Sequence, residues 1–387
     1  MNTPYTLFNA SRIVGGPGSL DQLPALAAEL GARRVLVVSD KGVAAAGLVE
    51  PARAALAKAG MAVQVIDNTP PEPEVKDVDA VLAAAREGGG CDLVVGIGGG
   101  SAMDVAKIVA VLLAHPVSLR ALLDKSASIT ARGLPTIMVP TTSGTGSEAT
   151  PNSIILVPED ELKVGIVSPL LMPDIVILDP LLTLTLPAGV TASTGMDALT
   201  HAIECYCSKK RTPFSDLFGL EAIRLIAGSL RRAFDNGRDV EARADMLLGA
   251  YYGGACIATS STTAVHALAY PLGGKYRVPH GLSNAMLLPT VMEFNIEGSE
   301  TRFAAMARAM GLDVAGLSER AAGERFIAAL HQLNADLGIK SDLKAVGVTE
   351  ADLDGLVDGA AKVTRLLDNN PRPMTRADMR AIYQSLI

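Results

Sequence analysis

The sequence predicts two domains of different class: an α/β domain with a mostly parallel sheet over residues 1–184, and an all-α domain over residues 185–387. The first observation is that short apolar runs rich in Val and Ile alternate with alanine-rich stretches in the first half, which is typical of parallel sheets covered by helices. The second is that such runs almost disappear from Thr191 onward, where long helical segments follow one another. A chain of 387 residues is long enough for both cores.

The strands predicted for the first half are short and almost entirely apolar, which indicates a sheet covered on both faces. They span residues 35–38, 63–66, 93–97, 136–139, 154–157, 164–167 and 175–178. Helical spacing occupies residues 43–60, 75–88 and 101–114. This order of elements is typical of sheets that bind dinucleotides.

The helices predicted for the second half are separated by segments that carry Pro, Gly or Asn, as helix ends require. They span residues 191–208, 214–236, 240–258, 260–270, 281–294, 299–310, 317–337, 350–364 and 375–386. No internal repeat or low-complexity linker is visible, so the two domains are expected to pack tightly. A cleft between domains is the usual place for a ligand.

Composition indicates a soluble, well-buried globular protein. Hydrophobic residues make up 49% of the chain and charged residues 19%, which excludes a disordered chain. The net charge is −7 without any block of Lys or Arg, so neither nucleic acid nor a membrane is an expected partner. The four cysteines show no disulfide spacing, the N-terminus lacks the pattern of a signal peptide, and the longest apolar run, 108–114, is too short to span a bilayer. We therefore expect a cytoplasmic protein.

A glycine cluster follows the strand predicted at 93–97 and opens the next predicted helix. Its glycines let the backbone approach a phosphate closely, and the free N–H groups of a helix start favour negative charge. Glycine also serves ordinary tight turns, so the strand-to-helix position is what favours phosphate binding. The candidate cofactor-binding residues of this loop are Gly98, Gly99, Gly100, Ser101 and Asp104.

A second polar loop, PTTSGTGSE, follows the strand at 136–139. It contributes the candidates Thr141, Thr142, Thr145 and Ser147, whose hydroxyl groups could bind a dinucleotide or could simply cap turns. At the end of the first predicted strand, Asp40 could bond a ribose 2′-hydroxyl and repel a 2′-phosphate, which favours NAD over NADP. Asp40 could equally be a helix N-cap.

The strongest candidate site combines Asp197 and His201 with His266 and His280. Asp197 and His201 are four residues apart, so a helix presents both on one face, where such pairs also occur as ordinary surface neighbours. His266 and His280 would lie about 21 Å apart on one unbroken helix, but Pro271, Gly273, Gly274 and Pro279 predict a break that lets the chain fold back. Three imidazoles and one carboxylate suit Fe²⁺ or Zn²⁺.

The chain resembles the iron-dependent (group III) alcohol dehydrogenases, a family that includes lactaldehyde reductase and 1,3-propanediol dehydrogenase. The resemblance runs essentially end to end and depends on five motifs: GGGSAMDVAK from Gly98, PTTSGTGSEA from Pro140, GMDALTHAIE from Gly195, HALAYPLGG from His266 and VPHGLSNA from Val278. It implies an N-terminal α/β dinucleotide-binding domain and a helical C-terminal domain, the fold shared with dehydroquinate synthase. It also implies NAD(H)-linked hydride transfer between an alcohol and its aldehyde, and a homodimer or larger assembly.

The same resemblance assigns roles to residues. Asp197, His201, His266 and His280 fall at the positions of the metal ligands, with Fe²⁺ as the expected ion and Zn²⁺ as another possibility. Lys163 joins the two polar loops and Asp40 at the NAD positions. His266, His280 and Tyr270 are the catalytic candidates, and Asn152, Ile257 and Arg365 are the substrate candidates.

Three of these positions depart from the family pattern. Tyr270 stands where many members carry a further histidine near the substrate, and Ile257 stands where lactaldehyde reductase has an aromatic residue. Arg365, together with Lys275 and Arg277, could bind an acidic substrate or could be solvated.

The departures leave other activities open. One alternative is an oxidoreductase for an acidic substrate, similar to hydroxyacid–oxoacid transhydrogenase or maleylacetate reductase, although the intact metal set disfavours the latter. Another is an NAD- and metal-dependent lyase of the dehydroquinate synthase type. A nucleotide-sensing or assembly subunit would predict damaged ligands or phosphate loops, and the sequence shows neither.

Overall fold

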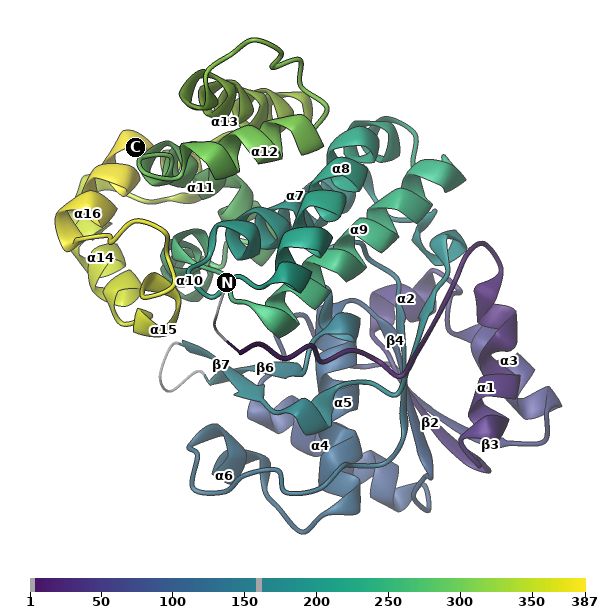
Figure 1. Ribbon diagram of the computed structural model, residues 1–387. Helices are drawn as coiled ribbons and strands as arrows, with labels where there is room; N and C mark the ends of the chain where they lie inside the picture. The colour runs from purple at the N-terminus through teal and green to yellow at the C-terminus, as the bar shows by residue number, and fades with distance from the viewer. Residues whose placement is uncertain (1–3, 158–161) are drawn as a thin grey trace. The chain divides into compact units, whose positions relative to one another are not determined.

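The computed structural model describes residues 4–157 and 162–387, and the side chains of residues 162 and 163 also lie outside that description. The chain separates into two compact units. The α/β unit contains residues 8–142 and 146–185, and the helical unit contains residues 186–387, Ser143–Thr145 and the stretch that ends at Leu7. Figure 1 shows the sheet strands in the purple to teal part of the chain and only helices in its green to yellow part, so the predicted fold class is confirmed.

The α/β unit is built on a six-stranded sheet in which every neighbouring pair is parallel. Its order is β1-β8-β5-β4-β2-β3. These strands are β1 (Arg12–Gly15), β2 (Arg34–Val38), β3 (Ala62–Ile66), β4 (Leu93–Gly98), β5 (Thr136–Pro140) and β8 (Ile175–Leu178). Parallel strands need crossover connections, and helices supply most of them.

Helices cover both faces of this sheet, as its apolar strands require. Along β2, Leu36 and Val38 join one core cluster and Val35 and Val37 the other, because successive side chains point to opposite faces. The α-helices in the described part of this unit are α1 (Leu23–Glu29), α2 (Lys41–Ala45), α3 (Glu50–Lys58), α4 (Val75–Glu87), α5 (Gly100–Ala114) and α6 (Leu119–Leu123). Side chains of α4 and α5 line the first cluster and those of α1 and α3 the second.

Three details differ from the sequence prediction. The single helix predicted over 43–60 is two helices, α2 and α3, because the chain breaks at Gly47 with a φ of +75°. The strands β6 (Asn152–Val157) and β7 (Leu162–Val167) exist as predicted but form a separate antiparallel pair. The edge strand β1 was not predicted, since only four residues form it and three of them are exposed.

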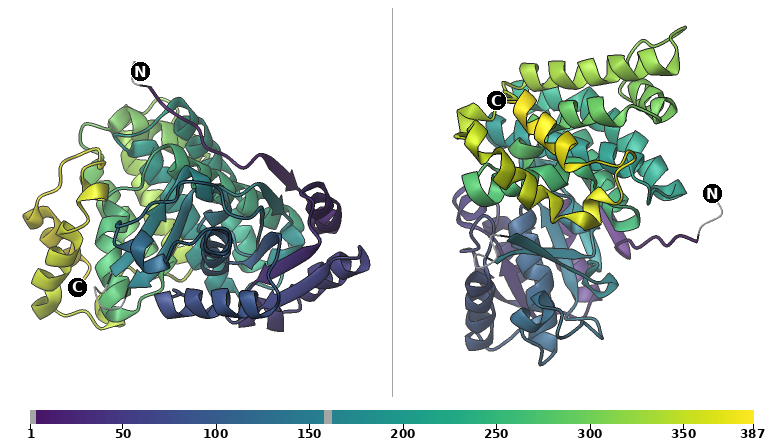
Figure 2. Two further views of the ribbon diagram at one scale, coloured as in Figure 1. Left: turned by 90° about the horizontal axis from the view of Figure 1, so that it is seen from below. Right: turned by 90° about the vertical axis from the view of Figure 1, so that its left-hand side faces the viewer.

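The helical unit is organised around α7 (Ala188–Cys207), whose buried residues share one large core with most of the other helices. The remaining helices are α8 (Pro213–Asp235), α9 (Val240–Thr259), α10 (Ala264–Tyr276), α11 (His280–Asn295), α12 (Glu300–Ala309), α13 (Glu319–Asp336), α14 (Leu353–Ala361), α15 (Thr364–Leu367) and α16 (Arg376–Ser385). Figure 2 shows the last helices of the chain, in yellow, packed against the green helices of the same unit. Among the described residues, no helix is both long and apolar enough to cross a membrane.

Candidate metal centre

Asp197 and His201 lie on the predicted helix, one turn apart on α7. Only 2% of Asp197 and 4% of His201 is exposed, so neither belongs to a solvated helix face. Burying a carboxylate and an imidazole is costly unless polar partners compensate for the lost water. The burial therefore excludes the reading of this pair as ordinary surface neighbours.

His266 and His280 approach α7 from two consecutive helices. His266 lies in the first turn of α10, and His280 is the first residue of α11. The reversal between them occurs at Arg277, which has a φ of +54°, and at Pro279, the residue before α11. The sequence pattern predicts that α10 stops at Pro271, and that prediction is wrong. The helix runs on to Tyr276, and the Pro271 ring packs over Gly359 of α14, where a Cβ would lie 2.9 Å from Pro271 Cγ.

A glycine permits the close approach of α11 to α7. A Cβ on Gly281 would lie only 2.3 Å from the carbonyl oxygen of Ser193 and 3.2 Å from Cβ of Asp197. Only a residue without a side chain fits there, and it directly follows His280. The start of α11 thus brings the His280 ring to the face of α7 that carries Asp197.

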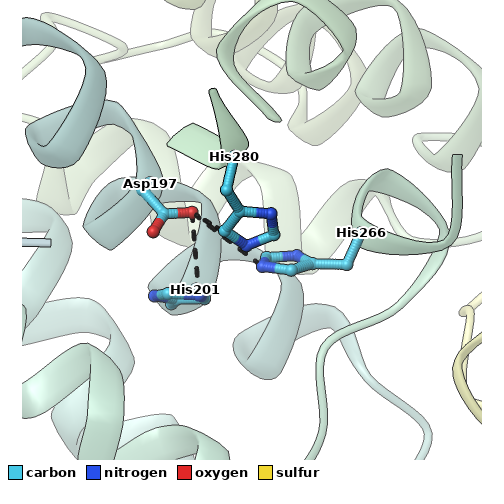
Figure 3. Close-up of side chains that lie close together, drawn as sticks. All are labelled: Asp197, His201, His266 and His280. Atoms are coloured by element: carbon cyan, nitrogen blue, oxygen red, sulfur yellow. Dashed lines mark ion pairs between the residues drawn. The ribbon is translucent and has the colours of Figure 1, made fainter. Parts of the chain in front are cut away.

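The four side chains form one group, which we call the ligand cluster: Asp197, His201, His266 and His280. One potential ligand atom from each lies within 4.8 Å of every other. Oδ1 of Asp197 is 3.8 Å from Nε2 of His201, 4.0 Å from Nε2 of His266 and 3.7 Å from Nε2 of His280 (Figure 3). Ligand atoms around a tetrahedral ion with bonds near 2.1 Å are about 3.4 Å apart. The donor set and its spacing therefore fit a divalent ion.

The electrostatics of the cluster favour a cation. Burial by itself would raise the pKa of the Asp197 carboxyl, but the three facing histidines and the amide of Asn284 more than offset it and lower that pKa to about 2. Burial lowers the pKa of His201, against the opposing attraction of Asp197. A carboxylate that stays ionised beside a buried, neutral imidazole is the protonation state that a metal ion requires.

Two residues that the sequence analysis left without a role surround the cluster. The buried carboxylate of Glu204 faces Nδ1 of His266 and also accepts hydrogen bonds from Thr263 and Val265. Nδ2 of Asn284 donates to Oδ1 of Asp197 at 2.7 Å. Spacing could have indicated Glu204, because positions 197, 201 and 204 share one face of a helix. The same spacing could have indicated Asn284, which lies four residues after His280 on α11.

Tyr270 lies close to the cluster. Its ring centroid is 6.2 Å from that of His280, and burial raises the pKa of its hydroxyl, against the opposing effect of Arg365. Arg365 is exposed on α15, and Ile257 is partly buried on α9. Lys275 is paired with Asp352 at 2.5 Å on the surface.

In the α/β unit, the predicted glycine loop opens α5. Gly99 is the N-cap residue of α5, and Gly98 has a φ of +156°, a backbone conformation that other residues rarely adopt. A Cβ on Gly98 would lie 3.2 Å from Oδ2 of Asp40, and one on Gly99 would lie 3.5 Å from Oγ1 of Thr142. Asp40 also caps α2 by accepting from the N–H of Val43 at 2.9 Å. The loop therefore gathers four predicted cofactor residues at the start of α5.

The remaining candidates of this unit have other partners. Asp104 is buried and accepts from the Ser147 hydroxyl at 2.5 Å and from the N–H of Ile154 at 3.0 Å. It pairs with the fully buried ammonium of Lys107, which also donates to the carbonyl of Asn152. These contacts connect α5 to the second polar loop, so Asp104 and Ser147 bind each other.

The other predicted cofactor-binding residues lie as follows. The Ser101 hydroxyl accepts from the N–H of Glu72 at 3.2 Å, and the buried hydroxyl of Thr141 has no hydrogen-bond partner among the described residues. Gly100 is the first residue of α5, and Thr145 groups with the helical unit. Lys163 lies on β7 opposite Leu156, and its side chain is outside the described part of the structure.

A parallel α/β sheet with a glycine loop at the start of α5 and a largely buried Asp-His₃ cluster in the helical unit are features expected of an oxidoreductase that uses a nucleotide and a metal ion. Two family profiles match this chain. The profile of the iron-containing alcohol dehydrogenases covers residues 10–180, and that of the C-terminal part of the Fe-containing alcohol dehydrogenase family covers residues 191–387. The chain belongs to the iron-containing alcohol dehydrogenase family, and the prediction of an alcohol dehydrogenase is confirmed.

Known relatives cover nearly the whole chain. It is 42% identical to long-chain-alcohol dehydrogenase 1 of Geobacillus thermodenitrificans over 372 residues, which are 96% of this chain and 93% of the relative. It is 37% identical to the 1,3-propanediol dehydrogenase of Klebsiella pneumoniae, with 95% of each chain covered. Among solved structures, a 1,3-propanediol oxidoreductase superposes with a TM-score of 0.95 at 35% identity over 100% of both chains.

A further solved relative carries a cofactor. The sulfoacetaldehyde reductase of Bifidobacterium kashiwanohense was crystallised in complex with NAD⁺. It superposes with a TM-score of 0.91 at 30% identity, covering 100% of this chain and 99% of its own.

Proposed function

We propose that this protein catalyses reversible hydride transfer between the carbinol carbon of an alcohol and NAD, at a divalent metal ion held by the ligand cluster. The observation that carries the proposal is the convergence of one carboxylate oxygen and three imidazole nitrogens within 4.8 Å of one another. Fe²⁺ is the expected ion, because the family is iron-containing, and Zn²⁺ also suits this donor set.

The protein side chains prepare the site for a polar substrate. When bound, a divalent ion would supply Lewis acidity at the oxygen of an alcohol or aldehyde substrate. Asp197, His201 and His266 are almost fully buried and would hold the ion away from bulk water. His280 is more open, with 29% of its side chain exposed, and leaves one side accessible to substrate. Tyr270 keeps its proton at neutral pH, so its hydroxyl can donate a hydrogen bond to the substrate oxygen.

The α/β unit is proposed to bind NAD through the backbone of Gly98, Gly99 and Gly100 and the hydroxyl groups of Ser101, Thr141 and Thr142. The free N–H groups at the start of α5 favour the pyrophosphate. Asp40 borders the glycine loop, where a carboxylate repels the extra 2′-phosphate of NADP. Bound NAD supplies the hydride acceptor. The proposed NAD site also includes four further residues: Asp104, Thr145, Ser147 and Lys163.

Three further assignments are proposed with this function. The domain boundary is placed between residues 184 and 185. A homodimer or larger homo-oligomer in the cytoplasm is proposed, in line with four cysteines that are all free. Asn152, Ile257 and Arg365 are proposed to contribute to the substrate pocket.

The test is an activity and metal panel on the purified protein. Separate preparations loaded with Fe²⁺ or Zn²⁺ are assayed for NADH formation with alcohols and for NADH or NADPH consumption with aldehydes. His280→Ala is expected to abolish metal retention and turnover and to stay folded. His331→Ala is the matched control, because His331 is exposed and pairs with Glu293 outside the cluster. Wild-type activity in His280→Ala would refute the site, and absence of net NADH with every alcohol would favour the lyase.

A second candidate substrate class is the hydroxyacids. Arg365 is close enough to influence the pKa of Tyr270, and its cation could bind the distal acid group of a substrate. The chain is also 37% identical to the 4-hydroxybutyrate dehydrogenase of Cupriavidus necator over 380 residues. Comparing kcat/KM for 4-hydroxybutyrate with that for butan-1-ol distinguishes the two classes. The second candidate is supported if the wild type prefers 4-hydroxybutyrate and the Arg365→Gln variant has lost that preference.

A further inference from the structure

We propose that Glu204 is a positioning residue of the metal centre, which holds His266 in the tautomer whose Nε2 lone pair faces the ligand cluster and thereby sets the affinity for the metal. The inference rests on the proposed function, because it takes the ligand cluster to be the metal site. It deepens that function by assigning a determinant of metal affinity outside the four ligands.

Glu204 continues the row of side chains that Asp197 and His201 begin on α7. Residues four and seven positions after Asp197 lie on nearly the same face of a helix. Glu204 is fully buried, with 0% of the residue exposed. A buried carboxylate requires hydrogen-bond donors around it, so its partners reveal what it does.

The two oxygens of Glu204 serve different partners. Oε1 accepts from the Thr263 hydroxyl and from the N–H of Val265, both at 2.7 Å, at the start of α10. Oε2 faces Nδ1 of His266. An ionised carboxylate can only accept hydrogen bonds, so Nδ1 of His266 carries the hydrogen. The other ring nitrogen, Nε2, is then unprotonated and available to a metal ion.

Asn284 supports the same tautomer from the opposite side of the ring. Its Nδ2 donates to Oδ1 of Asp197 at 2.7 Å and lies 3.1 Å from Nε2 of His266. The same nitrogen lies 3.3 Å from Nε2 of His280, so its two hydrogens face three acceptors, and a lone pair on Nε2 of His266 is compatible with this arrangement. The contact with Glu204 therefore determines the tautomer, and the contact with Asn284 agrees with it.

An amide at position 204 would reverse this arrangement. In Glu204→Gln, the amide oxygen is needed by Thr263 and Val265, so the amide nitrogen faces His266. That nitrogen donates, and Nδ1 would have to accept, which moves the ring hydrogen to Nε2. A hydrogen on Nε2 points at the metal position and must be removed before His266 can bind. The substitution thus acts on the metal while preserving the shape of the side chain.

The charge of Glu204 adds to this effect. A divalent cation bound here would be balanced by the two buried carboxylates, Asp197 and Glu204, with the histidines as neutral ligands. Removing one carboxylate leaves an excess positive charge in a buried site, where charge is costly. A carboxylate behind a metal-binding histidine also makes that imidazole a stronger ligand.

The alternative is that Glu204 only anchors the start of α10. Thr263→Val separates the two roles, because it deletes one hydrogen bond to Oε1 and leaves the contact with His266 intact. If Glu204 is only an anchor, Glu204→Gln and Thr263→Val should both change stability and neither should change metal affinity. If Glu204 positions His266, only Glu204→Gln should change metal affinity.

The experiment measures metal binding, not catalysis. Metal-free wild type, Glu204→Gln and Thr263→Val are titrated with Co²⁺ and Zn²⁺ against a competing chelator, and the Co²⁺ absorption spectrum reports the ligand geometry. Urea unfolding of the metal-free proteins gives stability. We expect Kd to rise about 10–100-fold in Glu204→Gln, as for other partners of metal ligands, with an altered Co²⁺ spectrum. Thr263→Val should stay within about threefold of wild type.

Each outcome decides between the proposals. A wild-type Kd and spectrum in Glu204→Gln overturn the positioning role and leave the metal centre intact. Absence of one bound ion per wild-type chain overturns the metal centre itself. If Glu204→Gln does not fold, Glu204→Asp replaces it, because it keeps the charge but draws the carboxylate back from His266. The same loss of affinity is then expected, and wild-type affinity overturns the role.

Discussion

Replacing Gly281 by alanine should displace one metal ligand without changing any ligand. Gly281 directly follows His280, and its backbone packs against α7 so closely that an added Cβ would lie 2.3 Å from the Ser193 carbonyl oxygen. Side-chain Cβ atoms do not come closer than 3.0 Å to such an atom, so the two backbones must separate by about 0.7 Å, the difference between these distances. Neither partner is a flexible side chain that could rotate away.

The required movement exceeds what a metal site tolerates. Metal–ligand distances hold to within about 0.2 Å, so a shift of the start of α11 by several times that amount takes Nε2 of His280 out of bonding position. We expect the Kd for Zn²⁺ to rise by at least about 100-fold, the upper end of the loss caused by altering groups behind the ligands. The strain should also lower the free energy of unfolding of the metal-free protein by about 1–3 kcal/mol.

The assay is a chelator-competition titration with Zn²⁺, accompanied by urea unfolding of the metal-free proteins. Gly228→Ala is the matched control, because it lies in α8 and its added Cβ has no atom within 4 Å. That control should bind metal like wild type and gain about 0.5–1 kcal/mol of stability. Wild-type affinity in Gly281→Ala would show that the close approach of α11 does not position His280, or that His280 is not a ligand.

Three further predictions concern the α/β unit. Asp40→Ser keeps a cap for α2 but removes the charge near the glycine loop, so the NADP-to-NAD ratio of kcat/KM should rise at least about tenfold. Lys107→Met leaves Asp104 buried without its cation and should lower the free energy of unfolding by about 3–5 kcal/mol in urea. Burial raises the pKa of Glu148 from 4.5 to about 7, so the folded state binds an extra proton and this group's contribution to stability falls as pH rises between those values. The stability of Glu148→Gln relative to wild type should therefore increase across that interval.

The fold class could be predicted from the sequence because the local hydrophobic patterns agree with the architecture of the whole chain. The fully apolar strands required two covering layers of helices, and the structure has a core on each side of β2. The face of α7 that carries Asp197 and His201 was also predictable, since helical periodicity alone determines it. The exposed strand β1 was not, because its pairing with β8 depends on contacts far apart in the sequence.

The convergence of His266 with His280 was predicted for a partly wrong reason. The break was expected at Pro271, yet α10 accommodates this proline, whose ring packs over Gly359 of α14. Sequence periodicity could not reveal that contact, because Gly359 lies 88 positions away along the chain. The actual reversal depends on the left-handed conformation of Arg277, a residue type with no preference for that conformation.

The buried polar groups of the ligand cluster lower the stability of the metal-free folded protein, and they are explained by a binding function. A hydrophobic replacement for these buried polar groups would avoid their loss of hydration, as removal of other buried ion pairs does. Asp197, His201 and His266 are at most 4% exposed, and one potential ligand atom from each lies within 4.8 Å of the others. A bound ion would offset this loss of hydration only in the folded state, since α7, α10 and α11 form no common site in the unfolded chain. At a free metal concentration 100 times Kd, the folded state gains about 2.7 kcal/mol, so occupancy of the centre and persistence of the helical unit should be coupled.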